Sequence, residues 1–178
     1  MATAVRAFIG LGANLGDAAA TIADALDRLA AIDGVRLVAV SSLYRTAPFE
    51  AEGPDFLNAV AEVATTLPAG ELLRRLQAIE RSHGRERPYR NAPRTLDLDL
   101  LVWNALRIDT PGLQLPHPRM HLRAFVLAPL AEIAPEVELP GLPPLGEMLR
   151  ACADQRIDAI ADPRSLLASS RVDKESGR

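Results

Sequence analysis

Several features that often reveal a protein's function are missing from this 178-residue sequence. It has one cysteine, Cys152, so it can form no internal disulfide and no zinc site built on cysteines. It has one lysine, Lys174, and therefore lacks the Gly-Lys-Ser/Thr sequence of a Walker A phosphate-binding loop. If the chain binds nucleotide phosphates, arginine side chains and metal ions must do so instead.

Long hydrophobic runs are also absent. No stretch of about 18 consecutive apolar residues exists, so no membrane-spanning helix is predicted. The first ten residues do not combine a charged segment with a following apolar one, and we therefore expect a cytoplasmic protein that does not associate with membranes. Because 48% of the residues are apolar, we expect one domain with its own core over residues 1–161 and a flexible polar tail over residues 162–178.

Charge is unevenly distributed along the chain. The net charge at pH 7 is −3, yet residues 74–94 hold seven arginines against two glutamates. A basic segment in an acidic protein indicates a local anion-binding site rather than a surface that coats nucleic acid. Aromatic residues make up only 4% of the chain, which also argues against an RNA-binding sheet.

The hydrophobic pattern predicts alternating strands and helices. Residues 56–65 alternate between two faces, as in a strand, whereas the apolar residues of 17–31 recur at helical spacing. Strands are expected over residues 5–11, 35–44, 56–65 and 95–103, helices over 17–31, 67–82, 121–133 (broken at Pro129) and 145–153, and loops or irregular segments over 45–55, 83–93 and 107–123. The order βαββαβ predicts an α+β sandwich with a largely antiparallel sheet.

A glycine-rich turn follows the first predicted strand. Gly10, Gly12 and Gly16 have the spacing GxGxxxG, one residue longer than the GxGxxG of dinucleotide-binding folds. No acidic residue stands at the end of the second strand, where such folds bind the ribose. We therefore interpret these glycines as a tight turn between a strand and a helix.

The most informative feature is the pair Asp97 and Asp99 in the predicted strand 95–103. Alternate residues of a strand share a face, so the two residues lie about 6.6 Å apart along one side. Such carboxylates repel each other unless a cation lies between them, and Mg²⁺ is typically held by one or two carboxylates and substrate phosphates. An amphipathic strand with a solvated acidic face explains the pair equally well.

Arginines beside this pair favour the metal site. Arg85 and Arg87 lie in the predicted loop 83–93, and Arg94 follows it directly, three residues before Asp97. Arginine forks together with metal ions neutralise polyphosphates. Ion pairs between arginine and aspartate, without a ligand, are the alternative. They would leave so many arginines in one segment unexplained.

Other candidates are weaker when taken alone. His117 lies between two prolines and can donate a hydrogen bond to a phosphate, although a lone histidine is more often structural. Gln77 and Glu80 fall on the polar side of the helix predicted over 67–82, where solvated surface residues are expected. The few phenylalanines can stack on a flat ring, but composition alone places them in the core.

Longer motifs resemble one enzyme family. Residues 90–101 (RNAPRTLDLDLL) are similar to the characteristic motif of the 6-hydroxymethyl-7,8-dihydropterin pyrophosphokinases of folate biosynthesis, and residues 8–16 (FIGLGANLG) resemble that family's first strand and turn. Further motifs follow in the family's order at residues 42–46, 56–59, 77–80, 115–117 and 123–125. The resemblance extends from about residue 4 to residue 135. It implies a ferredoxin-like βαββαβ core in an αβα sandwich, in agreement with the predicted order of elements.

The resemblance also implies an activity and a site. The family transfers pyrophosphate from ATP to the hydroxymethyl group of the reduced pterin and releases AMP, with two Mg²⁺ ions on the carboxylates that match Asp97 and Asp99. Arg85 and Arg94 match catalytic arginines that neutralise the phosphates. The residues that match ATP-binding positions are Gln77, Glu80, Arg87, Leu100, Leu113, His117 and Arg123. The residues that match pterin-binding positions are Thr46, Phe49, Phe56, Asn58 and Phe125. We expect a monomer that binds these two substrates and no nucleic acid.

One departure and two alternatives accompany this interpretation. Asn91 stands where the family often has a tryptophan, so the stacking role of that ring is lost or falls to Tyr89. An RNA-binding α+β domain would show a gel shift with steep salt dependence. A two-metal phosphohydrolase would release free phosphate from ATP without any pterin.

Overall fold

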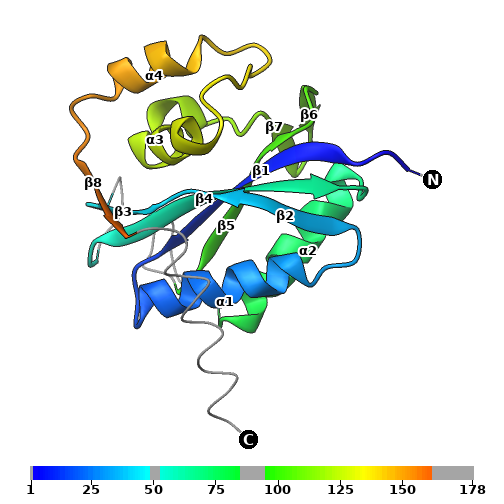
Figure 1. The fold of residues 1–178 in the computed structure, drawn as a ribbon, viewed down its shortest axis with the longest axis horizontal. Helices are drawn as coiled ribbons and strands as arrows, with labels where there is room; N and C mark the ends of the chain where they lie inside the picture. Colours follow the sequence, from blue (N-terminus) through cyan, green and yellow to red (C-terminus); the bar gives the residue numbers. More distant parts are fainter. Residues whose placement is uncertain (1, 49–52, 85–94, 162–178) are drawn as a thin grey trace, which may run out of the picture.

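A six-stranded sheet forms the middle layer of the computed structural model, which describes residues 2–48, 53–84 and 95–161 (Figure 1). The strands are β1 (Val5–Ala13), β2 (Val35–Val40), β3 (Leu43–Thr46), β4 (Phe56–Thr65), β5 (Asp97–Trp103) and β8 (Ile157–Ala161). Their order is β5-β1-β4-β3-β8, β2 also pairs with β4, and every pair is antiparallel. The predicted antiparallel sheet is therefore confirmed.

Helices cover both faces of this sheet (Figure 1). Helices α1 (Ala18–Ala30) and α2 (Ala69–Ser82) lie on one face, and α3 (Ala124–Ile133) and α4 (Leu145–Ala151) lie on the other. Strand residues alternate between two separate cores, so Ile9 and Leu11 of β1 pack toward α1 and α2, whereas Phe8 packs toward α3. The predicted αβα sandwich with a βαββαβ core is confirmed.

The single strand expected over residues 35–44 is instead two strands. Ser41, which is fully buried, separates β2 from β3. Its backbone N–H donates to the Val60 carbonyl, and its hydroxyl accepts a hydrogen bond from the Val60 N–H, both at 2.9 Å. The serine hydroxyl thus replaces a backbone acceptor in the ladder, which lets both strands pair with β4 although the chain is interrupted between them.

Two further expectations about residues 107–133 are wrong. The segment expected to be irregular contains a hairpin, β6 (Ile108–Thr110) and β7 (Leu113–Leu115), and a short 3₁₀ helix over Met120–Leu122. Helix α3 begins at Ala124 and continues through Pro129 without a break. Proline removes one backbone donor, but Leu127 and Leu130 on the same helix are fully buried, and their packing outweighs that loss.

The sheet also gains a strand that the sequence pattern did not indicate. β8 pairs with β3 and lies at the end of the sheet. The tail predicted over residues 162–178 lies outside the described residues. Within the described ranges, no helix has both the length and the apolar character needed to cross a membrane.

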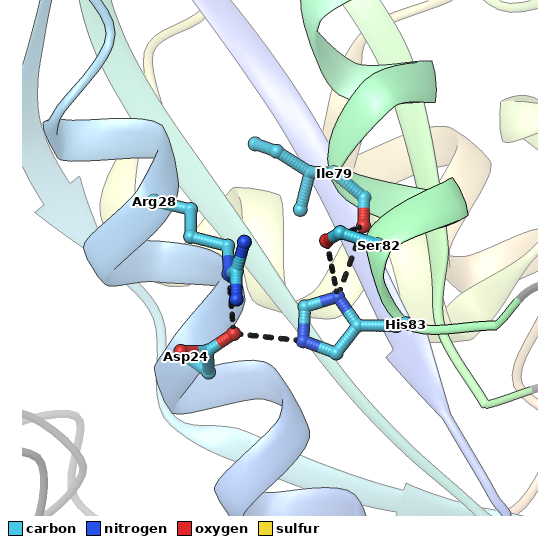
Figure 2. A network of polar contacts seen from close by, with 5 residues as sticks. All are labelled: Asp24, Arg28, Ile79, Ser82 and His83. Carbon is cyan, nitrogen blue, oxygen red and sulfur yellow. Dashed lines mark hydrogen bonds and ion pairs between the residues drawn. The ribbon is translucent and has the colours of Figure 1, made fainter.

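A polar network joins α1 to α2 where α2 ends (Figure 2). His83 Nε2 lies 2.8 Å from Asp24 Oδ2, and Arg28 Nε donates to the same oxygen at 2.7 Å. His83 Nδ1 lies 3.0 Å from the Ile79 carbonyl oxygen. Although partial burial opposes it, hydrogen bonding to Arg28 and the charges of Arg28 and His83 lower the pKa of Asp24. The network fixes the C-terminal end of α2 against α1.

Candidate active site

The two aspartates of β5 occupy the face of the sheet that α3 covers. Along β5, Leu98 and Leu100 are buried in the core beneath α1 and α2, so the alternating Asp97 and Asp99 lie on the opposite face. The register of β1 and β5 agrees, because Gly12 and Gly10 are the cross-strand partners of the two aspartates. The structure thus places both carboxylates on one side, as the strand pattern predicts.

Two nitrogen-bearing side chains approach Asp99 from the segment before α3. Arg123 Nη1 lies 3.8 Å from Asp99 Oδ2, and His117 Nε2 lies 4.0 Å from Asp99 Oδ1. Arg123 also lies over the ring of Phe125, 5.5 Å from its centroid. The chain therefore brings a carboxylate, a guanidinium, an imidazole and an aromatic ring together at the start of α3.

His117 is electrically neutral in this environment. Burial, together with the charges of Arg123 and Arg119, lowers its pKa to about 4, against the opposing effect of Asp97. Its Nδ1 accepts a hydrogen bond from the Arg119 backbone N–H at 3.2 Å, so the remaining ring proton is on Nε2. Nε2, the atom that faces Asp99, is consequently a hydrogen-bond donor.

The expectation that Glu80 lies on a solvated helix face is wrong. Its side chain is buried, with 2% of the residue exposed, and it accepts a hydrogen bond at 2.8 Å from the backbone N–H of Leu98. Leu98 stands between Asp97 and Asp99, on the edge strand of the sheet. Glu80 thus fixes the backbone that carries both aspartates, whereas Gln77 on the same helix is exposed.

A cleft of about 530 Å³ opens beside β5, between α2 and the β6–β7 hairpin. Its apolar lining includes Leu100 and Leu113, two of the residues expected to contact ATP, and its polar lining includes Asp99 and His117. The volume falls in the range of small-molecule sites. Gln77 is not among the residues that line this cleft.

The residues expected to bind the pterin gather on β3 and β4. Asn58 Nδ2 donates to Thr46 Oγ1 at 2.7 Å, and both residues are buried. Phe56 is the cross-strand partner of Thr46 and is half-buried. Asn14, which was not among the predicted site residues, donates from Nδ2 to the Pro54 carbonyl at 3.1 Å and ties the turn after β1 to the segment before β4. Its only sequence signal is its place in the glycine-rich turn.

Some predicted site residues cannot be placed. Phe49, Arg85, Arg87 and Arg94 lie outside the described residues. Six of the described ones form two groups on the α3 side of the sheet, with Asp99, His117 and Arg123 at β5 and with Thr46, Phe56 and Asn58 at β3 and β4. Gln77, Glu80 and Leu100 belong to the α2 side instead. Phe125 stands at the start of α3, which packs over β4 and connects the two groups.

Paired carboxylates, a guanidinium and a neutral imidazole beside a cleft are groups suited to binding metal ions and phosphates, and the antiparallel αβα sandwich places them on an α+β fold. Comparison with known proteins identifies the family. The profile of the 7,8-dihydro-6-hydroxymethylpterin-pyrophosphokinase (HPPK) family matches residues 8–135, and the chain belongs to this family.

Relatives of high similarity support the assignment. The chain is 44% identical over 156 residues to the 2-amino-4-hydroxy-6-hydroxymethyldihydropteridine pyrophosphokinase of Pseudomonas aeruginosa, covering 87% of this chain and 96% of that one. It is 46% identical over 133 residues to the enzyme of the same name from Bacillus subtilis, covering 74% and 80%. The protein is therefore an enzyme of folate biosynthesis that transfers the pyrophosphoryl group of ATP to hydroxymethyldihydropterin.

Solved structures agree on the fold. A Plasmodium falciparum HPPK-DHPS crystal structure with pteroate superposes with a TM-score of 0.69 at 13% sequence identity. The match covers 86% of this chain and 43% of the other, so this chain spans less than half of that fused protein. Another HPPK-DHPS structure, in complex with substrates, also gives 0.69 and covers 85% of this chain and 44% of the other.

Proposed function

We propose that the transfer takes place on the α3 side of β5, where Asp97 and Asp99 hold two Mg²⁺ ions together with the phosphates of ATP. The observation that carries this proposal is the placement of Asp99 within 4.0 Å of both His117 Nε2 and Arg123 Nη1, on the rim of the cleft. Anionic and cationic groups side by side suit a ligand that combines metal ions with phosphates.

The chemistry of the donors fits magnesium. Two carboxylates share one strand face, and no cluster of three or more His, Cys, Asp or Glu side chains suited to a metal occurs in the described part of the chain. Magnesium commonly binds to one or two carboxylates and completes its coordination with phosphate oxygens and water, which two aspartates alone would allow. When bound, it would neutralise phosphate charge and polarise the attacking hydroxyl.

Residues in the cleft and beside it would bind ATP. Arg123 would neutralise phosphate oxygens, and His117 would donate from Nε2 without bringing a charge of its own. Arg85, Arg87 and Arg94, from the basic segment, would add further positive charge. The remaining proposed contacts to ATP are Leu100 and Leu113 in the cleft and Gln77 and Glu80 on α2.

The second group of residues would bind the pterin. The Asn58 carboxamide is oriented by Thr46 and can read the polar edge of a flat heterocycle. Phe56 and Phe125 would stack on its two faces, and the backbone at Phe49 would help to fix the ring. The pterin residues and the aspartates share one face of the sheet, which supports a pose with the hydroxymethyl group toward β5.

The reaction exchanges one P–O bond for another. The hydroxyl oxygen of the pterin bonds to the β-phosphorus and releases its proton to solvent, the bond from that phosphorus to the oxygen bridging to the α-phosphate breaks, and AMP leaves. The chain contributes by holding both substrates in line and by stabilising the charge that develops on the phosphate oxygens. We further propose that the protein acts as a cytoplasmic monomer.

Asparagine variants of the two aspartates test the proposal. Asp97→Asn and Asp99→Asn each keep the side-chain size but weaken cation binding, and we expect AMP formation from ATP, Mg²⁺ and the pterin to be abolished. Asp109→Asn is the matched control, because Asp109 also lines the cleft but belongs to the hairpin and is exposed. Activity like that of the wild type in either β5 variant would refute the metal assignment. Phosphate release without pterin would instead favour a hydrolase.

A further inference from the structure

Two glycines stand in the middle of the face that carries the proposed site. Gly12 on β1 is the cross-strand partner of Asn58 on β4 and of Asp97 on β5. Gly10 is two residues earlier and faces the same side. Position 12 therefore lies between the residue proposed to read the pterin and one proposed to bind magnesium.

The backbone does not require glycine at position 12. Positive φ angles occur at Asn104 and at six glycines that lie outside the strands, Gly16 among them. Neither Gly10 nor Gly12 has a positive φ angle. Glycine within a strand weakens it, because it loses more conformational freedom on folding and has no side chain to pack. The reason for glycine at this position must therefore be the space that a side chain would fill.

A side chain at position 12 would collide with Asn58. A Cβ atom built on Gly12 would lie 2.9 Å from Asn58 Oδ1 and 3.9 Å from Phe56 Cδ1. Asn58 has little freedom to withdraw, because it is 5% exposed and its Nδ2 is engaged with Thr46 Oγ1. At Gly10, by contrast, a Cβ atom would make only ordinary contacts, at 3.6 Å to Leu101 and 3.8 Å to Asp99 Cβ.

We infer that Gly12 is a positioning residue that determines specificity for the pterin: by lacking a side chain, it keeps the Asn58 carboxamide oxygen in place and leaves the floor of the ring site open. Asn58 Oδ1 faces position 12, so it is an acceptor for the N–H donors of an aminopyrimidinone ring. The distance from β4 to β5 is two strand spacings, about 9.5 Å. A bicyclic ring with one edge at Asn58 fits in this distance and can direct its substituent toward Asp97. This inference rests on the proposed pterin-binding role of Asn58.

Alanine variants at the two glycines test the inference in a matched way. We expect Gly12→Ala to raise the KM for the pterin about tenfold, the worth of roughly one hydrogen bond, with little change in the KM for ATP. Gly10→Ala, on the same face of the same strand, should leave both KM values close to those of the wild type. Equal pterin KM values in the two variants, or equal losses for pterin and ATP in Gly12→Ala, would overturn the inference.

A double variant separates this inference from the proposed function. If position 12 acts through Asn58, Gly12→Ala should add almost nothing to the effect of Asn58→Ala, and the double variant should fold and bind ATP even if Gly12→Ala alone does not. Additive effects on the pterin KM, or a double variant as unstable as Gly12→Ala, would overturn it. Wild-type pterin affinity in Asn58→Ala would instead refute the pterin site itself. If Asn58→Ala weakens pterin binding but Gly12→Ala does not, only the role of Gly12 is refuted.

Discussion

Replacing Glu80 should loosen the strand that carries both aspartates. The buried Glu80 carboxylate accepts a hydrogen bond from the Leu98 N–H at the edge of the sheet, and Leu98 is itself 5% exposed. Glu80→Ala removes this acceptor and leaves the amide in a poorly hydrated place. Glu80→Gln keeps an oxygen of similar reach but removes the negative charge.

The size of the effect follows from the geometry. A hydrogen bond to a charged group contributes about 1.5–3 kcal/mol, and a buried donor without a partner costs about 1–3 kcal/mol. We therefore expect Glu80→Ala to lower the free energy of unfolding by about 2–3 kcal/mol. At about 2–4 °C per kcal/mol for a chain of this size, Tm should fall by roughly 5–10 °C. Glu80→Gln should cost about 1 kcal/mol, since a neutral acceptor remains.

Three measurements examine this reasoning. Urea unfolding gives the free energies, amide hydrogen exchange reports the Leu98 N–H directly, and the rate of AMP formation shows whether the aspartates have moved. Glu71→Ala on the same helix is the control, because its ion pairs with Arg74 and Arg75 are on the surface, screened by solvent, and should contribute little to stability. Equal stabilities of the alanine and glutamine variants, with unchanged exchange at Leu98, would refute the proposed role of Glu80.

Three further outcomes are expected. Phe125→Ala should raise the dissociation constant for the pterin while sparing that for ATP, measured by calorimetry; equal losses of both would contradict stacking. Burial and the charge of Glu132 raise the pKa of Tyr44 to about 12, so the free energy of unfolding should fall as pH rises from 10 toward 12, and Tyr44→Phe should flatten this dependence. Asp24→Asn, which removes the negative charge that pairs with Arg28 and His83, should lower the free energy of unfolding by less than about 1 kcal/mol. Its difference from the wild type should shrink below pH 3.8, where the advantage of a lowered aspartate pKa is lost.

The elements predicted best are those whose apolar residues recur at regular strand or helix spacing. β4 occupies the predicted residues 56–65, and α1 begins one residue after Asp17, whose side chain accepts a hydrogen bond from the Ala20 N–H. The two missed features of the sheet depend on distant partners. β8 exists because β3 offers an edge, and the break at Ser41 depends on Val60. Neither partner can be identified from the local pattern.

In the site too, features set by the local sequence pattern are predicted correctly, and features set by distant partners are not. Strand alternation was sufficient to place Asp97 and Asp99 on one face, because a period of two fixes side-chain direction. Glu80 was misjudged because a helix wheel does not show that the edge of β5 comes within hydrogen-bond distance of α2. The sequence pattern predicts a turn from Gly12 onward, after a strand that ends at residue 11, although β1 extends to Ala13 and pairs on both sides. The role we infer for Gly12 depends on its partners across the sheet, Asn58 and Asp97.

The strand β8 has a consequence for anyone who shortens this chain. It pairs with β3, the strand that holds Thr46, and so covers backbone groups of β3 on the side away from β4. Removing residues from 157 onward would uncover those donors and acceptors, and uncovered strand edges recruit strands from other molecules. A shortened chain would then be prone to aggregate through the very edge that borders the proposed pterin site.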